Sequence, residues 1–251
     1  MATNALFPQP IAHRGLHDFS RGIVENTASA FEAAIAAGYA IECDVQLSAD
    51  GVPYIFHDDD LPRLVGREGR SDEIGIDEIT SLPLLGSATR DTPQRFTEFL
   101  AQVAGRTLLQ IELKRQATAA QTETLARAVT TALARYQGPQ VIESFDPHLL
   151  LAMRKAGYRD KLGIITYSWN ISDWDADIPA GQKFALRHLL HWPLTRFSFI
   201  SCHDVALDLP AVRFFRALGI PVTAWTVKSA AQAKAVMRKA DQLVFEGFDP
   251  R

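Results

Sequence analysis

A chain of 251 residues with 47% hydrophobic residues can bury one large core, and α/β barrels often reach this size as a single domain. Its net charge of −3 and its pI near 6.2 give no reason to expect a nucleic acid or an anionic membrane as partner. The two cysteines, Cys43 and Cys202, are too few for a disulfide framework, and we expect both to be buried thiols.

The opening decapeptide, MATNALFPQP, has neither the basic segment nor the apolar core of a signal peptide. No stretch approaches the about 20 apolar residues that a membrane-spanning helix needs. We therefore expect a cytoplasmic enzyme without stable membrane insertion. Its oligomeric state stays open.

The first predicted unit is a short strand followed by a helix. Pro10–His13 is the strand, and Gly15 ends it. Asn26 and Thr27 have the side chains of N-cap residues for the helix, and Gly38 suits the position just after its end.

The second predicted strand, Tyr39–Leu47, carries two carboxylates. Glu42 and Asp44 are two residues apart, so they point to the same side of the strand. Asp50-Gly51 then predicts a two-residue hairpin turn. Such a turn would place Asp44 opposite His57.

The segment 58–93 is irregular and predicts a small insertion at the active-site rim, with a short helix near Asp77–Ser81. Beyond it, strands and helices alternate. The predicted strands are Thr107–Leu113, Gln140–Phe145, Leu162–Thr166, Phe197–Cys202, Val222–Val227 and Leu243–Phe245. The predicted helices span 96–103, Thr118–Tyr136, Pro147–Ala156, Gly181–Trp192, Pro210–Leu218 and Ala230–Ala240.

This alternation predicts an α/β fold with a parallel sheet. Eight strands indicate a closed (β/α)8 TIM barrel over residues 1–251, with a β-hairpin after strand 2 and the insertion at its rim. The alternative is an open doubly wound sheet. It is disfavoured because no glycine-rich phosphate-binding motif follows the first strand.

A series of short motifs runs in order along the chain. They are His13-Arg14-Gly15, Glu25-Asn26, Glu42-Cys43-Asp44, Asp50-Gly51, His57-Asp58, Ile111-Glu112-Leu113-Lys114, Glu143-Ser144-Phe145 and Trp225-Thr226-Val227. The series resembles the glycerophosphodiester phosphodiesterases, which are TIM barrels of the phospholipase C-like phosphodiesterase group. The resemblance covers nearly the whole chain and implies the barrel and the activity together.

Three carboxylates form a candidate metal site. The active site of a TIM barrel lies at the carboxyl ends of the strands, where Glu42, Asp44 and Glu112 are expected. Their mutual repulsion would be relieved by a divalent cation, and all-oxygen ligands favour Mg²⁺ or Ca²⁺, with Mn²⁺ as a further option. The resemblance implies the same ligand set.

His13 and His57 are the candidate general acid and base, because imidazole titrates near neutral pH. Which of them is the acid stays open. Arg14 and Lys114 would form a positive pocket for the phosphodiester. The alternative for each is a structural ion pair, with Glu112 as the partner of Lys114.

Several other residues carry weaker hypotheses. Glu143 either orients Lys114, lines the substrate pocket or is structural, and Trp225 either stacks on glycerol or packs in the core. Glu25 either hydrogen-bonds His13 or the site edge, or caps the helix. His203 is a weaker candidate for contact with the leaving group, and His17 is treated as an ordinary surface histidine.

We therefore expect a metal-dependent enzyme that hydrolyses a small glycerophosphodiester to glycerol 3-phosphate and an alcohol. Direct attack by water and attack by the neighbouring glycerol hydroxyl give the same products, and both stay open. The alternatives are a related enzyme acting on lysophospholipid or inositol phosphodiesters and a non-catalytic barrel that binds phosphate esters. Two departures from the family pattern, Lys228 and the segment Val244–Phe248, are expected to affect the leaving group more than the catalytic step.

Overall fold

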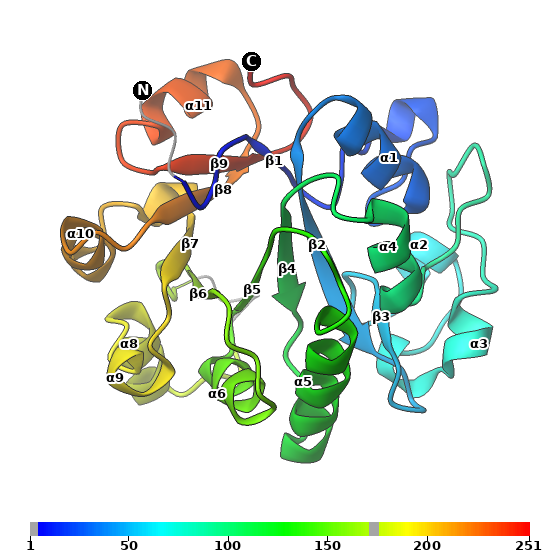
Figure 1. Ribbon diagram of the computed structural model, residues 1–251, viewed down its shortest axis with the longest axis horizontal. Coiled ribbons are helices and arrows are strands. Elements are labelled where there is room, and N and C mark those ends of the chain that lie inside the picture. Colours follow the sequence, from blue (N-terminus) through cyan, green and yellow to red (C-terminus); the bar gives the residue numbers. More distant parts are fainter. Residues whose placement is uncertain (1–4, 171–175) are drawn as a thin grey trace.

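The computed structural model describes residues 5–170 and 176–251. In this part of the chain, eight parallel strands form a closed ring, and a ninth strand pairs antiparallel with one of them. Helices surround the ring (Figure 1). The predicted (β/α)8 TIM barrel is confirmed, and the alternative of an open sheet is wrong because the first two strands pair and close the ring.

The ring strands, in chain order, are β1 (Ile11–Ala12), β2 (Ala40–Leu47), β4 (Leu109–Leu113), β5 (Gln140–Ser144), β6 (Leu162–Thr166), β7 (Phe199–His203), β8 (Val222–Val227) and β9 (Gln242–Phe245). The helices after them are α1 (Ala28–Ala36), α4 (Phe96–Val103), α5 (Ala119–Leu133), α6 (Pro147–Lys155), α8 (Ala180–Arg187), α9 (Trp192–Thr195), α10 (Pro210–Ala217) and α11 (Ala230–Val236). Single turns of 3-10 helix are η1 (Phe19–Arg21) and η3 (Asp204–Ala206). The helix predicted over Gly181–Trp192 corresponds to α8, which already ends at Arg187, and Leu189 beyond it has a positive φ of 53°. The separate helix α9 begins at Trp192.

β2 is buried along its whole length, but its two faces meet different surroundings. Ile41, Cys43 and Val45 belong to the apolar layer between the strands and the helices. Glu42 and Asp44 alternate with them and therefore point into the barrel. The prediction that these two carboxylates share a face is confirmed.

An apolar plug fills the amino-terminal end of the barrel. It consists of Phe7, Ile11, Ala40, Leu108, Val141, Phe199 and Val244. A Cβ atom on Gly163 of β6 would lie 2.2 Å from the ring of Phe199, so glycine is required beside it. The plug leaves the carboxyl ends of the strands as the place for a polar site.

The hairpin differs from its prediction by one residue. β2 pairs with β3 (Pro53–Ile55) so that Val45 lies opposite Ile55, and the amide of Phe56 donates to the carbonyl of Asp44. The turn therefore has a three-residue loop closed by Ser48 and Val52, instead of two residues at Asp50-Gly51. The expectation that Asp44 lies directly opposite His57 is wrong.

The segment 58–93 contains α2 (Pro62–Val65), the 3-10 turn η2 (Ser71–Glu73) and α3 (Ile76–Ile79). The last of these is the short helix predicted near Asp77–Ser81. The segment has an apolar cluster separate from the barrel core, formed by Val24, Tyr54, Phe56, Leu61, Leu64, Ile74, Ile76, Ile79 and Leu84. It is therefore held to the barrel through the β3 hairpin.

Cys43 and Cys202 are buried free thiols, as predicted. Across residues 5–170 and 176–251, no helix combines the length and the apolar character needed to span a bilayer.

Candidate active site

Three carboxylates converge inside the barrel at the ends of neighbouring strands. The parallel register of β2 and β4 pairs Asp44 with Glu112, and Glu42 precedes Asp44 on the same face. One oxygen from each of these three residues lies within 4.8 Å of the others, and all three residues are buried. The structure thus brings together the three predicted metal ligands.

The charges in this cluster oppose one another. Burial raises the pKa of Glu42 well above its ordinary value, and the neighbouring charges of Asp44 and Glu112 raise it further. Burial also raises the pKa of Glu112. Burial acts the same way on Asp44, but the positive charges of Lys114 and Arg14, among others, outweigh it and lower the pKa of Asp44. A cluster of oxygen ligands whose negative charges repel one another fits a hard divalent cation.

Lys114 lies between two of the carboxylates. Its Nζ atom is 3.0 Å from Oε1 of Glu112 and 3.5 Å from Oδ1 of Asp44. Although burial lowers the pKa of Lys114, the charges of Glu112 and Asp44 outweigh it and raise the pKa above its ordinary value. Lys114 also lines a cavity of about 260 Å³ together with His57 and Asp58. Lys114 therefore makes the ion pairs and also faces this cavity.

Arg14 is fixed by contacts on both its backbone and its side chain. Its amide donates to Oε2 of Glu42 at 2.9 Å, with φ at 54°. Its Nη1 donates to Glu25 at 2.7 Å, and its Nε lies 3.3 Å from Asp44. Glu25 thus pairs with Arg14. The alternative was a hydrogen bond from Glu25 to His13, and none joins these two side chains in the described residues.

Asn26 has a role that the sequence did not predict. Thr27 caps α1 by accepting from the amide of Ala30, as expected. Asn26 is not a second cap, because its Nδ2 donates to Oδ2 of Asp44 at 2.8 Å and its Oδ1 accepts from the Asp44 amide. It therefore fixes the orientation of that carboxylate.

His57 is oriented by the residue that follows it. Its Nδ1 lies 2.7 Å from Oδ1 of Asp58. Arg63 of α2 donates to Asp58 and also to both carboxylate oxygens of Glu25. The rim segment is thereby tied to His57 and, through Glu25, to Arg14. Arg63 was not among the predicted site residues.

His13 has one ring nitrogen in each of two environments. Its Nδ1 is 2.9 Å from Oε2 of Glu246, and its Nε2 is 3.9 Å from Oε2 of Glu42. Burial lowers the pKa of His13, although Glu246 acts in the opposite direction, so the neutral ring is favoured at neutral pH. Such a ring can accept a proton.

The segment Val244–Phe248 contacts the candidate catalytic histidine, which was not among its expected roles. Glu246 follows β9 and binds His13, and its other oxygen pairs with Nζ of Lys228. His17, treated as an ordinary surface histidine, places its Nε2 3.8 Å from Glu246. The sequence signal for this group was that two histidines, His13 and His17, follow the first strand closely.

Glu143 is buried on β5, where the parallel register pairs it with Glu112. Gln110 donates to its Oε1 at 2.9 Å, and burial, with the charge of Glu112, raises the pKa of Glu143 to about 8. Within the described residues no hydrogen bond or ion pair joins it to Lys114. Trp225 packs edge-on against Phe145.

The ring of His203 also packs against Trp225, and its Nδ1 lies 3.1 Å from Oδ1 of Asp204. Phe145, Trp225 and His203 therefore form one aromatic group. Whether His203 meets a leaving group remains a hypothesis.

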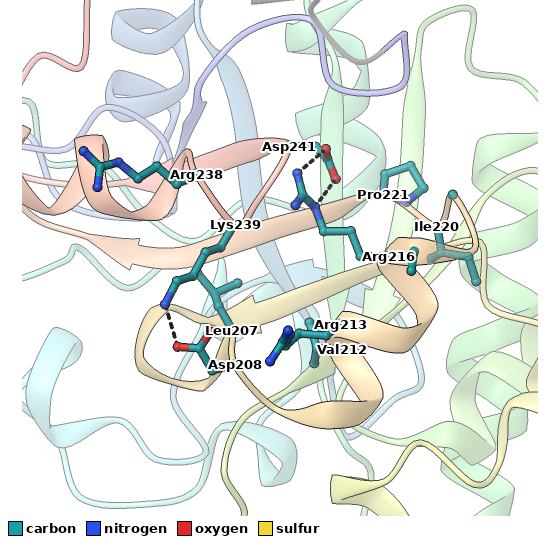
Figure 2. Close-up of a pocket in the computed structure, with 12 residues that line it drawn as sticks. Leu207, Asp208, Val212, Arg213, Arg216, Ile220, Pro221, Arg238, Lys239 and Asp241 are labelled. Carbon is teal, nitrogen blue, oxygen red and sulfur yellow. Dashed lines mark hydrogen bonds and ion pairs between the residues drawn. The ribbon is translucent and has the colours of Figure 1, made fainter.

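A larger cavity, of about 500 Å³, lies elsewhere. Figure 2 shows it between α10 and α11, crossed by the ion pairs Arg216–Asp241 and Lys239–Asp208. Pro221 and Asp241 line it just before β8 and β9 begin, so it is at the amino-terminal end of those strands. TIM-barrel active sites lie at the opposite end.

Known proteins resemble this chain over almost its whole length. Residues 13–248 match the model of the glycerophosphoryl diester phosphodiesterase family. Glycerophosphodiester phosphodiesterase 1 of Bos taurus is 26% identical over 239 residues, which cover 87% of this chain and 71% of the relative.

Solved structures share the fold. A phosphodiesterase of Oleispira antarctica, solved with the product sn-glycerol-3-phosphate, has a TM-score of 0.76 at 24% identity and covers 96% of this chain and 93% of its own. A glycerophosphodiester phosphodiesterase of Thermotoga maritima has a TM-score of 0.70 at 24% identity, with coverages of 98% and 96%. With a family match over almost its whole length, the chain belongs to the glycerophosphoryl diester phosphodiesterase family and is an enzyme of that class.

Proposed function

We propose that this enzyme hydrolyses glycerophosphodiesters to glycerol 3-phosphate and an alcohol, that it needs one divalent cation, and that His13 and His57 are its general acid and base. The observation that supports this most directly is the convergence of Glu42, Asp44 and Glu112 at strand ends that also present Lys114. The glycerol 3-phosphate bound to the Oleispira antarctica phosphodiesterase supports the product assignment.

Glu42, Asp44 and Glu112 would hold the cation, which is Mg²⁺ or Ca²⁺ by the chemistry of the donors, with Mn²⁺ as a further option. When bound, the cation neutralises charge on the phosphodiester oxygens and polarises the phosphorus centre. Asn26 keeps Asp44 oriented for this, and the backbone amide of Arg14 does the same for Glu42. Arg14 and Lys114 would bind the phosphodiester anion, which replaces part of their present ion pairing.

His13 and His57 are held in fixed orientations by carboxylates on their Nδ1 atoms, Glu246 and Asp58 respectively. Each therefore turns Nε2 toward the substrate space. One Nε2 would accept the proton of the attacking oxygen, and the other would donate a proton to the departing alkoxide. The attacking oxygen is either water or the neighbouring glycerol hydroxyl, and either route uses the same pair.

Two further residues complete the proposed substrate pocket. The face of Trp225 would pack against glycerol carbons, because aromatic rings cover such groups well. Glu143, paired with Glu112 in the strand register, would line the pocket as a neutral acid near pH 7. We also propose that residues 1–251 work as a single barrel domain, with 58–93 as its rim insertion.

The test is release of glycerol 3-phosphate from glycerophosphocholine and glycerophosphoethanolamine, first with EDTA and then after addition of Mg²⁺, Ca²⁺ or Mn²⁺. Metal-restored release supports the proposal. Release that EDTA leaves unchanged contradicts the metal requirement. No release with any ion contradicts the substrate assignment, and lysophospholipid and inositol phosphodiesters would then be tried.

A further inference from the structure

A second group of metal-binding side chains lies beside the carboxylate cluster. Nδ1 or Nε2 of His13 and of His17 and a carboxylate oxygen of Glu246 all lie within 4.8 Å of one another. Oε2 of Glu246 is 2.9 Å from Nδ1 of His13 and 3.8 Å from Nε2 of His17. Ligand atoms bound tetrahedrally at the usual zinc distances are about 3.3 Å apart, which lies between these two values.

The chemistry of this group differs from that of the carboxylate cluster. Two imidazole nitrogens and one carboxylate oxygen are the ligands of open zinc sites and of other borderline metals, whereas Mg²⁺ and Ca²⁺ prefer oxygen alone. The side chains of His13, His17 and Glu246 are 16%, 22% and 21% exposed, so an ion from solvent can reach them.

The environment of His17 is a second observation in favour of a cation site. Its Nε2 atom is buried, yet it has no hydrogen-bond partner in the part of the chain that the structure describes. The nearest acceptor named above, Oε2 of Glu246, is too distant for a hydrogen bond at 3.8 Å. A buried ring nitrogen aimed at a carboxylate oxygen across that gap would be satisfied by a metal ion.

Lys228 favours the required orientation of Glu246. Its Nζ pairs with Oε1, so Oε2 stays turned toward the two histidines. The other ring nitrogen of His13 remains near Glu42, 3.9 Å away. His13 therefore belongs at once to the oxygen cluster and to this nitrogen-containing one.

We propose that His13, His17 and Glu246 form a second cation site, selective for Zn²⁺ over Mg²⁺ and Ca²⁺, and that an ion bound there inhibits turnover. The ion would bind Nδ1 of His13 and replace its hydrogen bond with Glu246. The proton of the neutral ring would then be on Nε2, which could no longer accept a proton from the attacking oxygen. The inhibition rests on the proposed function of His13, whereas the binding does not.

The experiment measures Zn²⁺ binding to the full chain by equilibrium dialysis in excess Mg²⁺. Wild type should bind one Zn²⁺ that Mg²⁺ does not displace. Loss of an outer-shell partner already costs metal sites about 10- to 100-fold in affinity, so His17→Ala, which removes a direct ligand, should weaken binding at least as much. His148→Ala is the matched control, because that side chain is exposed and pairs with Asp146 instead of Glu246, and the Zn²⁺ affinity of this variant should be unchanged. Lys228→Ala, which removes an ion-pair partner of Glu246 but no ligand, should weaken binding less than His17→Ala does.

Two results would overturn the binding. One is equal Zn²⁺ affinity in His17→Ala and wild type. The other is Zn²⁺ binding that Glu112→Gln abolishes and His17→Ala does not, because the ion would then occupy the oxygen cluster. Visible absorption of bound Co²⁺ gives a separate readout of nitrogen ligation, which His17→Ala should change.

Turnover separates the two halves of the proposal. Zn²⁺ should inhibit glycerol 3-phosphate release in wild type, and His17→Ala should resist this inhibition while keeping its basal rate. If Zn²⁺ binds through His17 and turnover is unaffected, the inhibitory half is overturned, and with it the proposed role of His13. If the enzyme releases no glycerol 3-phosphate under any condition, the proposed function fails while the dialysis result still decides the zinc site.

Discussion

Asp44 on β2 and Glu112 on β4 are paired in the parallel register, and the ammonium group of Lys114 lies 3.5 Å from one carboxylate and 3.0 Å from the other. A buried cation in this position lets two buried acids remain close together. Because it also lines the cavity next to His57, it is the positive charge best placed to meet an incoming phosphate.

We expect Lys114→Met to lower kcat by about 100- to 1,000-fold, as loss of a group that stabilises charge in the transition state commonly does. The Asp44 pKa should rise, because Lys114 is the strongest of the charges that lower it. The measurement is steady-state release of glycerol 3-phosphate against pH. Lys155→Met, which breaks only the surface pair with Glu123, is the control, and equal rates in the two variants would contradict the role of Lys114.

We expect Asp58→Asn to lower kcat by about 100-fold or more, since His57 loses the carboxylate that orients it. The measurement is steady-state release of glycerol 3-phosphate. Asp160→Asn changes an exposed carboxylate just before β6 begins, at the amino-terminal end of the strands, and should leave the rate unaltered. A rate that Asp58→Asn leaves unchanged would show that His57 does not depend on this carboxylate.

Glu143 predicts a pH dependence of stability in the metal-free protein. The pKa is about 8 in the folded state against 4.5 ordinarily, so between these values the folded state binds more protons than the unfolded state. Stability should therefore fall as pH rises from about 4.5 to 8, by an amount on the order of a few kcal/mol for this group.

Urea unfolding across this pH range, with EDTA present, measures the effect. Glu143→Gln cannot titrate and should show a flatter curve than wild type. An unchanged slope would mean that Glu143 is ionised in the folded state.

We expect Gly163→Ala to destabilise the barrel by about 1–3 kcal/mol, because its new Cβ would meet the ring of Phe199 at 2.2 Å. The double variant Gly163→Ala/Phe199→Leu should recover part of the loss, since the smaller side chain makes room. Urea midpoints of the single and double variants give the coupling. Gly181→Ala, at a position with open space around it, is the matched control and should not destabilise.

Local pattern was sufficient to predict the barrel and the convergence of the three candidate carboxylate ligands. Alternation along β2 placed Glu42 and Asp44 on one face, and the order of strands and helices gave the closed ring. The hairpin register was missed by one residue, because Asp50-Gly51 fits both a two-residue and a three-residue loop, and the Ser48–Val52 closure decides between them.

The residues that were missed depend on contacts between distant parts of the chain. Glu246 reaches His13 across 233 positions, and Arg63 comes from an irregular segment whose path no periodicity describes. Asn26 was predicted to cap α1 on its residue type, but a neighbouring threonine took that position and left its amide for Asp44. Such roles follow only once the ring has closed.

The ion pairs of Arg63 connect the rim segment 58–93 to the candidate active site, so the geometry of the site depends on the folding of that segment. That segment has its own small apolar cluster and meets the catalytic end through Asp58 and Glu25. Clusters of this kind open locally at lower free energy than the core of a domain. On heating, the enzyme should therefore lose its catalytic geometry while the ring of strands is still intact, so that thermal inactivation precedes unfolding.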